Sequence, residues 1–322
     1  MLELDNVSAQ YETTDGKVYA VDGVTLTVKD DEIVGIAGES GCGKSTLLKL
    51  IYDYVSFPLE ITEGEVRITA EEDGKEKVWT SGQISKEWWK IISYVPQGAM
   101  HVMNPVVKVR KQFFDTIGKG LKKAQRKELE KDLEAYLAQL DLSPEVLDAY
   151  PHQLSGGMRQ RVLIALASFT SPNIILADEP TTALDVVVQR GILMMLKRVQ
   201  KQEKNSMILV SHDMGVHYQI THKMALMYAG QIVESGPTTE IFEAPRHPYT
   251  QMLIAALPRV GDDSQKEGIP GTPPNLRNPP KGCRFAARCP FVMDICREKD
   301  PVRTEVGPDH FASCHLLTEE SA

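Results

Sequence analysis

The chain has 322 residues, with 36 Lys and Arg against 44 Asp and Glu, which gives a formal net charge of −8. That length allows one large domain with an appendage, and the acidic balance argues against a nucleic-acid binder, which usually carries a basic face. No apolar stretch approaches the roughly 18 residues that cross a bilayer, and the N-terminus carries no basic-then-apolar signal segment. We therefore expect a cytosolic protein with no nucleic-acid partner, whose role at a membrane would depend on other subunits.

The first residues predict two paired strands. Residues 2–7 and 24–28 alternate between apolar and polar side chains, as half-buried strands do, and the turn-rich residues 12–16 join them. Tyr11 then falls on the loop after the first strand. An aromatic ring at that place can stack on a nucleotide base, although a single Tyr more often serves ordinary packing.

A phosphate-binding loop is predicted at residues 38–45, which read GESGCGKS. The loop follows an apolar strand pattern at 33–37 and opens a helical pattern at 46–50. Gly residues in such a loop let backbone N–H groups and the helix N-terminus bind phosphate. Lys44 would reach the β- and γ-phosphates, and the Ser45 hydroxyl would bind Mg²⁺; the alternative is a Gly-rich turn that binds nothing. The predicted nucleotide-binding residues are Tyr11, Ser40, Gly41, Cys42, Gly43, Lys44, Ser45 and Thr46.

Further short strands are predicted between residues 63 and 95. An acidic, hairpin-like segment lies at 71–74, and 91–95 reads as a buried strand. Gln97 follows this strand, where its side-chain amide could bind a metal ion or a water at the nucleotide site. Most Gln residues in such places only cap a loop, so both interpretations stay open.

Residues 106–150 change character and predict helices. Their apolar side chains recur at the helical period and would form one buried face, with Lys and Glu elsewhere. These side chains are Leu129, Leu133, Tyr136, Leu137 and Leu140. We interpret the stretch as part of an all-helical subdomain, over about residues 98–170, inserted into the nucleotide-binding core.

A second Gly-containing helix start lies at residues 154–161, which read LSGGMRQR. Ser155, Gly156 and Gly157 at the start of a helix make another anion-binding N-terminus. The alternative is a plain N-cap, in which the Ser155 hydroxyl satisfies backbone donors and binds no ligand.

Two acids end an apolar strand pattern at residues 174–177. Buried parallel strands have this continuous apolar character, and acids at their carboxyl ends face the ligand crevice. Asp178 suits Mg²⁺ coordination and Glu179 could orient and deprotonate a water, although such acids can also be solvated turn residues. Another buried strand, 207–210, precedes His212, which could reach a γ-phosphate at the same edge of the sheet. A single His in such a place is usually structural.

The composition changes after residue 258. Eight of the 19 prolines lie between Pro270 and Pro308, which predicts an irregular, turn-rich extension without a periodic core pattern. Four of the five cysteines also fall there, at Cys283, Cys289, Cys296 and Cys314. Disulfides are unexpected in a cytosolic chain, and structural zinc sites usually have tighter Cys pairs. An iron–sulfur cluster accepts looser spacings, with zinc and reduced thiols as the alternatives.

In this order, the motifs resemble those of ABC transporter ATPases over residues 1 to about 258. The adenine-stacking aromatic, the Walker A loop and the Q-loop are matched by Tyr11, residues 38–45 and Gln97. The signature, the Walker B acids, the D-loop and the switch histidine are matched by residues 154–160, Asp178 with Glu179, residues 183–185 and His212. Met158 stands where the signature most often has Gln.

The resemblance implies an α/β fold, with a P-loop NTPase (RecA-like) core of the ABC type, an antiparallel β subdomain, an inserted α-helical subdomain and an irregular C-terminal extension. The implied domains are 1–258 and 259–322. The implied catalytic residues are Glu179, His212 and Gln97, and the implied Mg²⁺ ligands are Ser45, Gln97 and Asp178. The implied signature residues, which act in trans on the ATP of a partner subunit, are Ser155, Gly156, Gly157 and Gln160.

Motifs near the C-terminus resemble those of oligopeptide, dipeptide and nickel importer ATP-binding subunits. They are HPYT at 247–250, IPGTPP at 269–274, GCRF at 282–285 and RCP at 288–290. This resemblance implies an ATPase that powers the uptake of peptides or related solutes at the cytoplasmic face of the cell membrane. Its implied partners are a second, homologous ATP-binding subunit, two membrane permeases and an extracytoplasmic solute-binding protein.

The same resemblance implies ATP, Mg²⁺ and a [4Fe–4S] cluster as cofactors, since some similar subunits are thought to hold a cluster on such cysteines. Import of nickel or an oligosaccharide is an alternative, and so is a soluble ABC ATPase without a transport role. Two features argue against a soluble ABC ATPase. Repair ATPases of that class have a very long coiled coil between the residues that correspond to Lys44 and Ser155, and this chain has none there. Translation factors of that class usually carry two cassettes, and this chain carries one.

Overall fold

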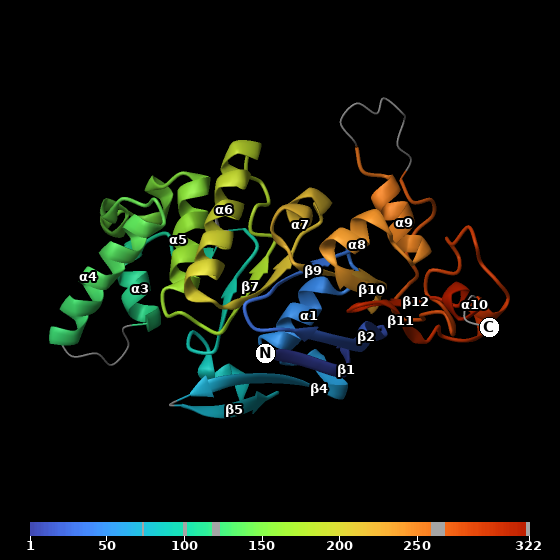
Figure 1. Cartoon of the computed structure of the whole chain (residues 1–322). Coiled ribbons are helices and arrows are strands. Elements are labelled where there is room, and N and C mark those ends of the chain that lie inside the picture. Colours follow the sequence, from blue (N-terminus) through green and yellow to red (C-terminus); the bar gives the residue numbers. More distant parts are fainter. Residues whose placement is uncertain (73, 99–101, 118–122, 259–267, 320–322) are drawn as a thin grey trace.

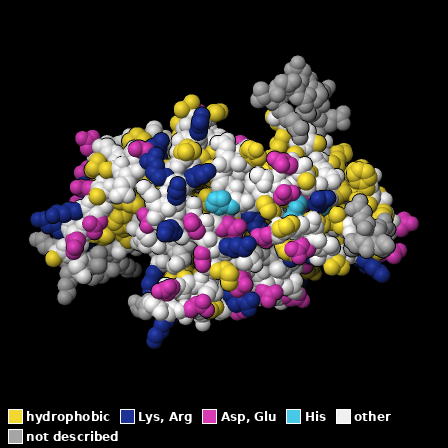
Figure 2. All heavy atoms as spheres, viewed as in Figure 1, with side chains coloured by type: hydrophobic (Ala, Val, Ile, Leu, Met, Phe, Trp, Pro, Cys, Tyr) yellow, Lys and Arg dark blue, Asp and Glu magenta, His cyan; other side chains and the backbone are white. Residues whose placement is uncertain are grey.

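The computed structural model describes residues 1–72, 74–98, 102–117, 123–258 and 268–319 (Figure 1). Two β-sheets, with helices packed around the larger one, form the frame of the molecule. On the face shown in Figure 2, Lys and Arg side chains lie interspersed with Asp and Glu side chains.

The smaller sheet is antiparallel. It contains β1 (Leu2–Thr13), β2 (Gly16–Val28), β4 (Leu59–Glu72) and β5 (Lys75–Thr80), in the order β2-β1-β4-β5. Leu2 pairs with Val28, which confirms the predicted pairing of the first strands. The expectation that Tyr11 lies on a loop is wrong. Tyr11 lies inside β1, because this strand continues with partners on both sides, Val18 in β2 and Leu59 in β4.

The larger sheet has a buried parallel centre. Its parallel strands are β6 (Ile92–Val95), β7 (Ile174–Asp178), β8 (Ser206–Val210), β3 (Ile33–Ala37) and β9 (Lys223–Tyr228), side by side in that order. β3, β7, β8 and β9 are buried along their whole length, as expected for strands covered on both faces. Since the carboxyl ends of parallel strands meet at one edge, the segments that follow β3, β6, β7 and β8 come together there.

Two core clusters cover the faces of the larger sheet. On one face, α1 (Lys44–Ile51) packs between the two sheets, where Leu47 and Leu48 join apolar residues of both. On the other face, a second cluster joins residues of the sheet to α5 (Gly156–Ser168), α6 (Val186–Glu203) and α7 (Met214–Ile220), and beyond them to α3 (Val109–Ile117) and α4 (Lys123–Gln139). Figure 1 shows α3, α4, α5 and α6 grouped at one end of the molecule. Leu133, Leu137 and Leu140 are buried in this second cluster, as their spacing predicts.

Short 3₁₀ segments connect the regular elements. They are η1 (Ile84–Glu87), η2 (Pro144–Asp148) and η3 (Pro151–Gln153). The η3 segment precedes α5, and Ser155 between them is the N-cap of α5.

The C-terminal extension is less irregular than expected, because it adds two strands to the larger sheet. Beyond β9 lie β10 (Gln231–Pro237), β12 (His310–Ser313) and β11 (Arg303–Gly307), each antiparallel to its neighbour. Two helices follow β10 before the extension, α8 (Thr238–Glu243) and α9 (Pro248–Ala255), and two lie within it, α10 (Ile295–Glu298) and α11 (Leu316–Glu319). Phe285 is buried in a core cluster with Tyr228 and Tyr249. The apolar residues of the extension therefore pack against the rest of the chain, which needs no periodic pattern.

Candidate functional site

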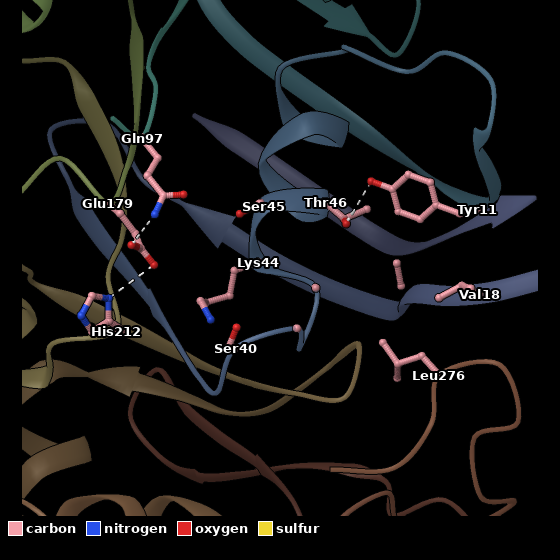
Figure 3. Close-up of a pocket in the computed structure, with 13 residues that line it drawn as sticks. Tyr11, Val18, Ser40, Lys44, Ser45, Thr46, Gln97, Glu179, His212 and Leu276 are labelled. Carbon is pink, nitrogen blue, oxygen red and sulfur yellow. Dashed lines mark hydrogen bonds and ion pairs between the residues drawn. The ribbon is translucent and has the colours of Figure 1, made fainter. Parts of the chain in front are cut away.

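A pocket of about 560 Å³ opens at the carboxyl edge of the larger sheet (Figure 3). Its lining residues are Tyr11, Val18, Ala20, Ser40, Gly41, Gly43, Lys44, Ser45, Thr46, Gln97, Glu179, His212 and Leu276. The fold thus brings together the predicted nucleotide-binding residues with the three predicted catalytic residues. Cys42 differs from the others, since its side chain is buried in the core cluster around α1.

The loop between β3 and α1 requires Gly at its tightest points. Gly43 has φ 108°, and a Cβ there would lie 2.2 Å from the carbonyl oxygen of Ala20. Lys44 is 7% exposed, and its Nζ donates hydrogen bonds to the carbonyl oxygens of Gly38 and Glu39 at 2.7 and 2.9 Å. The ammonium group therefore lies in the curl of the loop, beside the N-terminus of α1, where an anion would be bound.

Asp178 lies behind the loop with one free carboxylate oxygen. Tyr94 Oη donates to its Oδ2 at 2.9 Å, and the Ser45 side chain lies close enough to lower the pKa of this carboxylate. Burial raises the pKa of Asp178 above its ordinary value. Its Oδ1 is buried and has no hydrogen-bond partner among the described residues. A Ser hydroxyl beside an unsatisfied carboxylate oxygen is a donor set that Mg²⁺ prefers.

Glu179 is held by three side chains at the end of β7. Gln97 Nε2 donates to its Oε2 at 2.9 Å, and Thr182 Oγ1 donates to the same oxygen at 2.8 Å. His212 Nδ1 lies 3.4 Å from the other oxygen, Oε1. Figure 3 shows Gln97 and His212 converging on Glu179. The carboxylate is thereby oriented at the pocket wall, and Gln97 is bonded to it.

The opposite end of the pocket is apolar. Tyr11 lies there with its Oη 3.3 Å from Thr46 Oγ1, and Lys49 Nζ is 5.9 Å from the centre of the Tyr11 ring. Val18, Ala20 and Leu276 complete this end. A flat, largely apolar group would fit between these side chains, whereas a triphosphate would fit at the Lys44 end.

The signature residues lie outside this pocket. Ser155 is the N-cap of α5, and its Oγ accepts a hydrogen bond from Met158 N at 3.3 Å. Ser155 therefore has the N-cap role that the sequence left open as an alternative. Gly157 approaches α6 so closely that a Cβ there would lie 2.5 Å from Val188 Cγ1. Gln160 is buried, and its Nε2 has no hydrogen-bond partner in the described part of the chain.

The four cysteines of the extension line one small apolar pocket. Cys283, Cys289, Cys296 and Cys314 lie there with Phe285, Phe291 and Leu316, among other residues. All four are free thiols, and burial raises the pKa of Cys283 and of Cys314 to about 11. Among the described residues, no three His, Cys, Asp or Glu side chains are placed so that they could hold a metal ion together. The thiols are thus gathered, without the geometry of a single-ion site.

Sequence reasoning missed four residues of this region. Tyr94 could have been predicted as a site residue, because it is a polar aromatic residue inside an apolar strand just before Gln97. Thr182 and Leu276 carry no local pattern that marks them. Arg288 belongs to the RCP motif at 288–290, but the motif does not indicate its ion pair with Glu39 in the phosphate loop. Leu276 and Arg288 reach the site from the extension, and only the tertiary structure shows that.

Known proteins match the whole chain. The family described as ABC transporter matches residues 21–182. The dipeptide transport ATP-binding protein DppD of Caldanaerobacter subterraneus subsp. tengcongensis is 38% identical over 99% of this chain and 98% of its own. The chain belongs to the ABC transporter family. As an ATP-binding subunit of that family, it is an ATPase whose hydrolysis of ATP is coupled to transport.

Other comparisons extend this assignment of the ABC transporter subunit. A second family, described as oligopeptide/dipeptide transporter, C-terminal region, matches residues 233–296. The oligopeptide transport ATP-binding protein OppD of Bacillus subtilis is 38% identical over 98% of this chain and 89% of its own. The dimeric ATP-binding cassette MJ0796, solved in a post-hydrolysis state with ADP and Pi, is 28% identical, with a TM-score of 0.60 over 74% of this chain and 99% of that chain. Within the described residues, every helix is too short or too polar to span a membrane.

Proposed function

We propose that this ABC transporter ATPase powers the uptake of peptides through partner permeases. The geometry that supports a hydrolytic role is the joint presence, in one pocket, of Lys44 on the phosphate loop and of Glu179 oriented by Gln97 and His212. Peptides are proposed because the similar proteins are named for dipeptide or oligopeptide transport, and because the C-terminal region matches that class of transporter.

The proposed roles follow the chemistry of each side chain. Lys44 binds the β- and γ-phosphates, and the backbone of residues 40–46 cradles them. Glu179 orients and deprotonates the attacking water. Gln97 and His212 hold the Glu179 carboxylate in position at the end of the pocket that binds the γ-phosphate. Tyr11 stacks on the adenine ring.

Mg²⁺ fits the donors at Asp178. Ser45 and Asp178 would hold the ion, because their oxygens are adjacent and Oδ1 of Asp178 is unsatisfied. Gln97 is bonded to Glu179, so it would reach the ion only after releasing that carboxylate. When bound, Mg²⁺ neutralises negative charge on the phosphates.

A second ATP-binding subunit completes the site in this proposal. Ser155, Gly156, Gly157 and Gln160 lie outside the pocket of their own chain, so the N-terminus of α5 would bind the γ-phosphate of ATP held by a homologous partner subunit. ATP would then join two subunits at the cytoplasmic face of the cell membrane, beneath two permeases that receive solute from an extracytoplasmic binding protein.

The four cysteines would hold a [4Fe–4S] cluster. Four free thiols around one apolar pocket fit the thiolate donor set of such a cluster. The described residues contain no group of three ligands placed to hold one ion, so the proposal rests on the four Cys side chains that line the same pocket. When bound, the cluster would supply structural cross-linking of the extension, since ATP hydrolysis needs no electron transfer.

Transport is tested with the intact complex. The chain, its partner subunit and the permeases are reconstituted in vesicles with the solute-binding protein, and uptake of labelled di- and oligopeptides is measured with ATP. ATP-dependent peptide uptake, lost in a complex with Glu179→Gln, is expected. Uptake of nickel or an oligosaccharide in place of peptides would contradict the substrate, and ATP hydrolysis without any partner requirement would contradict the action in trans.

The cluster is tested separately by anaerobic purification. The protein should be brown, with about four irons and four acid-labile sulfides per chain. Cys289→Ser should bleach it, whereas Cys42→Ser, in the phosphate loop, should not. A colourless protein with stoichiometric zinc, or with four reactive thiols and no metal, would overturn the cluster and leave the ATPase assignment intact.

A further inference from the structure

A segment of the C-terminal extension lines the apolar end of the nucleotide pocket. Leu276 forms part of the pocket wall together with Tyr11, Val18 and Ala20. Figure 3 shows Val18 between Tyr11 and Leu276, so that the two larger side chains border this end of the pocket from opposite sides. The extension therefore reaches the site that the N-terminal part of the chain builds.

Backbone contacts hold this segment against the β1–β2 hairpin. Tyr19 N donates a hydrogen bond to the carbonyl oxygen of Leu276 at 2.9 Å. Asn278 N donates to the carbonyl oxygen of Asn275 at 3.1 Å, which closes a turn around Leu276. Arg277 also pairs with Asp15, in the hairpin connection, at 3.4 Å. Leu276 is thus fixed in position relative to β2 by the hydrogen bond of its own carbonyl oxygen and by the ion pair of the next residue.

We propose that Leu276 is a base-binding residue, which packs on the face of the adenine ring opposite Tyr11. The inference rests on the proposed nucleotide site. A purine ring has two apolar faces, and Tyr11 covers one of them by stacking. The hydrocarbon side chain of Leu276 removes the other face from water. The extension then contributes a binding residue to the nucleotide site of its own chain.

The placement of Leu276 makes its contribution specific to the base. Leu276 carries no polar side-chain atom, and the groups that would bind phosphate, Lys44 and Ser45, line the other end of the pocket. Loss of the Leu276 side chain should therefore weaken the binding of a nucleotide but leave the binding of a base-free polyphosphate unchanged.

The test compares two ligands on the full chain. Isothermal titration calorimetry measures the affinity for MgATP and for magnesium tripolyphosphate in the unmodified protein, in Leu276→Ala and in Leu276→Met. We expect Leu276→Ala to weaken ATP binding about three- to tenfold, from the apolar area lost, with tripolyphosphate binding unchanged. Leu276→Met, which keeps an apolar side chain of similar volume, should bind ATP as the unmodified protein does. Val302→Ala is the matched control, because Val302 is an apolar residue of the same extension that is 70% exposed and lies outside the pocket.

Each outcome decides the proposal. Equal loss of both ligands in Leu276→Ala would overturn it, since the residue would then act through the phosphate loop. Unchanged ATP affinity in Leu276→Ala would overturn it while leaving the nucleotide site intact. If the unmodified protein bound neither ligand, the proposed function itself would fail and the inference with it.

A labelling experiment needs no substitution. Photolysis of bound 8-azido-ATP attaches the purine to residues that it touches. Incorporation into the tryptic peptide that ends at Arg277, suppressed by excess ATP, is the expected result. Incorporation confined to peptides of the N-terminal part of the chain would contradict the contact with Leu276.

Discussion

Arg288 in the extension forms a two-pronged ion pair with Glu39 in the phosphate loop. Its Nη1 donates to Oε2 of Glu39 at 2.7 Å, and its Nη2 donates to Oε1 at 2.9 Å. The Arg288 side chain is 5% exposed, and Tyr228 Oη and the carbonyl oxygens of Ile269 and Pro270 accept further hydrogen bonds from it. Because the Glu39 carbonyl also accepts from Lys44, Arg288 and Lys44 hold the same residue from two sides.

Arg288→Ala should loosen the phosphate loop. We expect about tenfold weaker binding of both ATP and tripolyphosphate, because the Glu39 carboxylate loses a nearly buried partner worth about 1–3 kcal/mol. Arg288→Lys should restore only part of this loss, since one ammonium cannot make both bonds. The measurement is calorimetric titration, with Arg198→Ala as the control, because the Arg198 and Asp141 side chains form an ion pair outside the pocket and are 43% and 65% exposed. Unchanged affinity in a folded Arg288→Ala protein would show that the pair does not act on the loop.

Glu179→Gln should separate ATP binding from hydrolysis. The variant should bind ATP with unchanged affinity and hydrolyse it about 10²–10⁴-fold more slowly, because an amide cannot accept the proton of the attacking water. Phosphate release in the presence of the partner subunit gives the rate. Glu203→Gln, at a partly exposed carboxylate that accepts a hydrogen bond from Ser171, should hydrolyse ATP normally. Hydrolysis by Glu179→Gln at the unmodified rate would remove Glu179 from the mechanism.

Tyr94→Phe should weaken the response to Mg²⁺. The Tyr94 hydroxyl donates to Asp178, and burial raises the pKa of Tyr94, so the group stays a neutral donor. Without it, the Asp178 carboxylate loses the hydrogen bond that fixes its Oδ2, and we expect several-fold more Mg²⁺ for half-maximal hydrolysis. ATP binding without Mg²⁺ should not change. Tyr52→Phe, on the ring stacked against Trp88, is the control, and an unaltered Mg²⁺ requirement in Tyr94→Phe would refute the role.

The free energy of unfolding should fall as the pH falls from about 6.5 to 4. Burial lowers the pKa of His217 and of His247 to about 4 in the folded chain, against about 6.5 when unfolded. Between these values the unfolded chain binds more protons, so acid favours unfolding. At pH 5 the cost is about 2 kcal/mol per histidine.

Urea denaturation at pH 7.5, 6 and 5 measures this dependence. In His247→Asn the unfolding free energy should depend less steeply on pH, because Asn does not titrate. Asn can also replace His247 as the N-cap of α9, where the His247 Nδ1 accepts a hydrogen bond from Tyr249 N. Equal unfolding free energies at pH 7.5 and pH 5 in the unmodified protein would contradict the prediction.

The sequence predicts the elements around the site because each motif follows a buried strand. The apolar runs of β3, β6, β7 and β8 are local signals, and the rule that parallel strands end at one edge is enough to bring Lys44, Gln97, Glu179 and His212 together. The end of β1 could not be predicted. Its register shifts between Leu4 and Val7 and again near Ala9, and such bulges break the alternation by which a strand is recognised.

Contacts between the extension and the pocket could not be predicted either. The pairs Arg288–Glu39 and Tyr19–Leu276 join residues far apart in the sequence, and a single chain carries no pattern that links them. The hairpin of β11 and β12 could not be predicted from the sequence for a related reason. Its strands are short, and Pro and Gly residues flank them, so the composition resembles that of a loop.

The pairing of β12 with β10 also bears on how the protein is made. As the chain leaves the ribosome, β10 emerges roughly 70 residues before β12, so its outer edge has no partner for several seconds of synthesis. In the finished protein, His310 Nε2 lies 2.8 Å from Oε1 of Glu234, a carboxylate that is 1% exposed. Until residues 303–313 arrive, the nascent chain therefore presents an open strand edge beside an acid that has yet to be covered. An open edge of this kind is a template for pairing with other chains, and the pairing of β12 with β10 closes it.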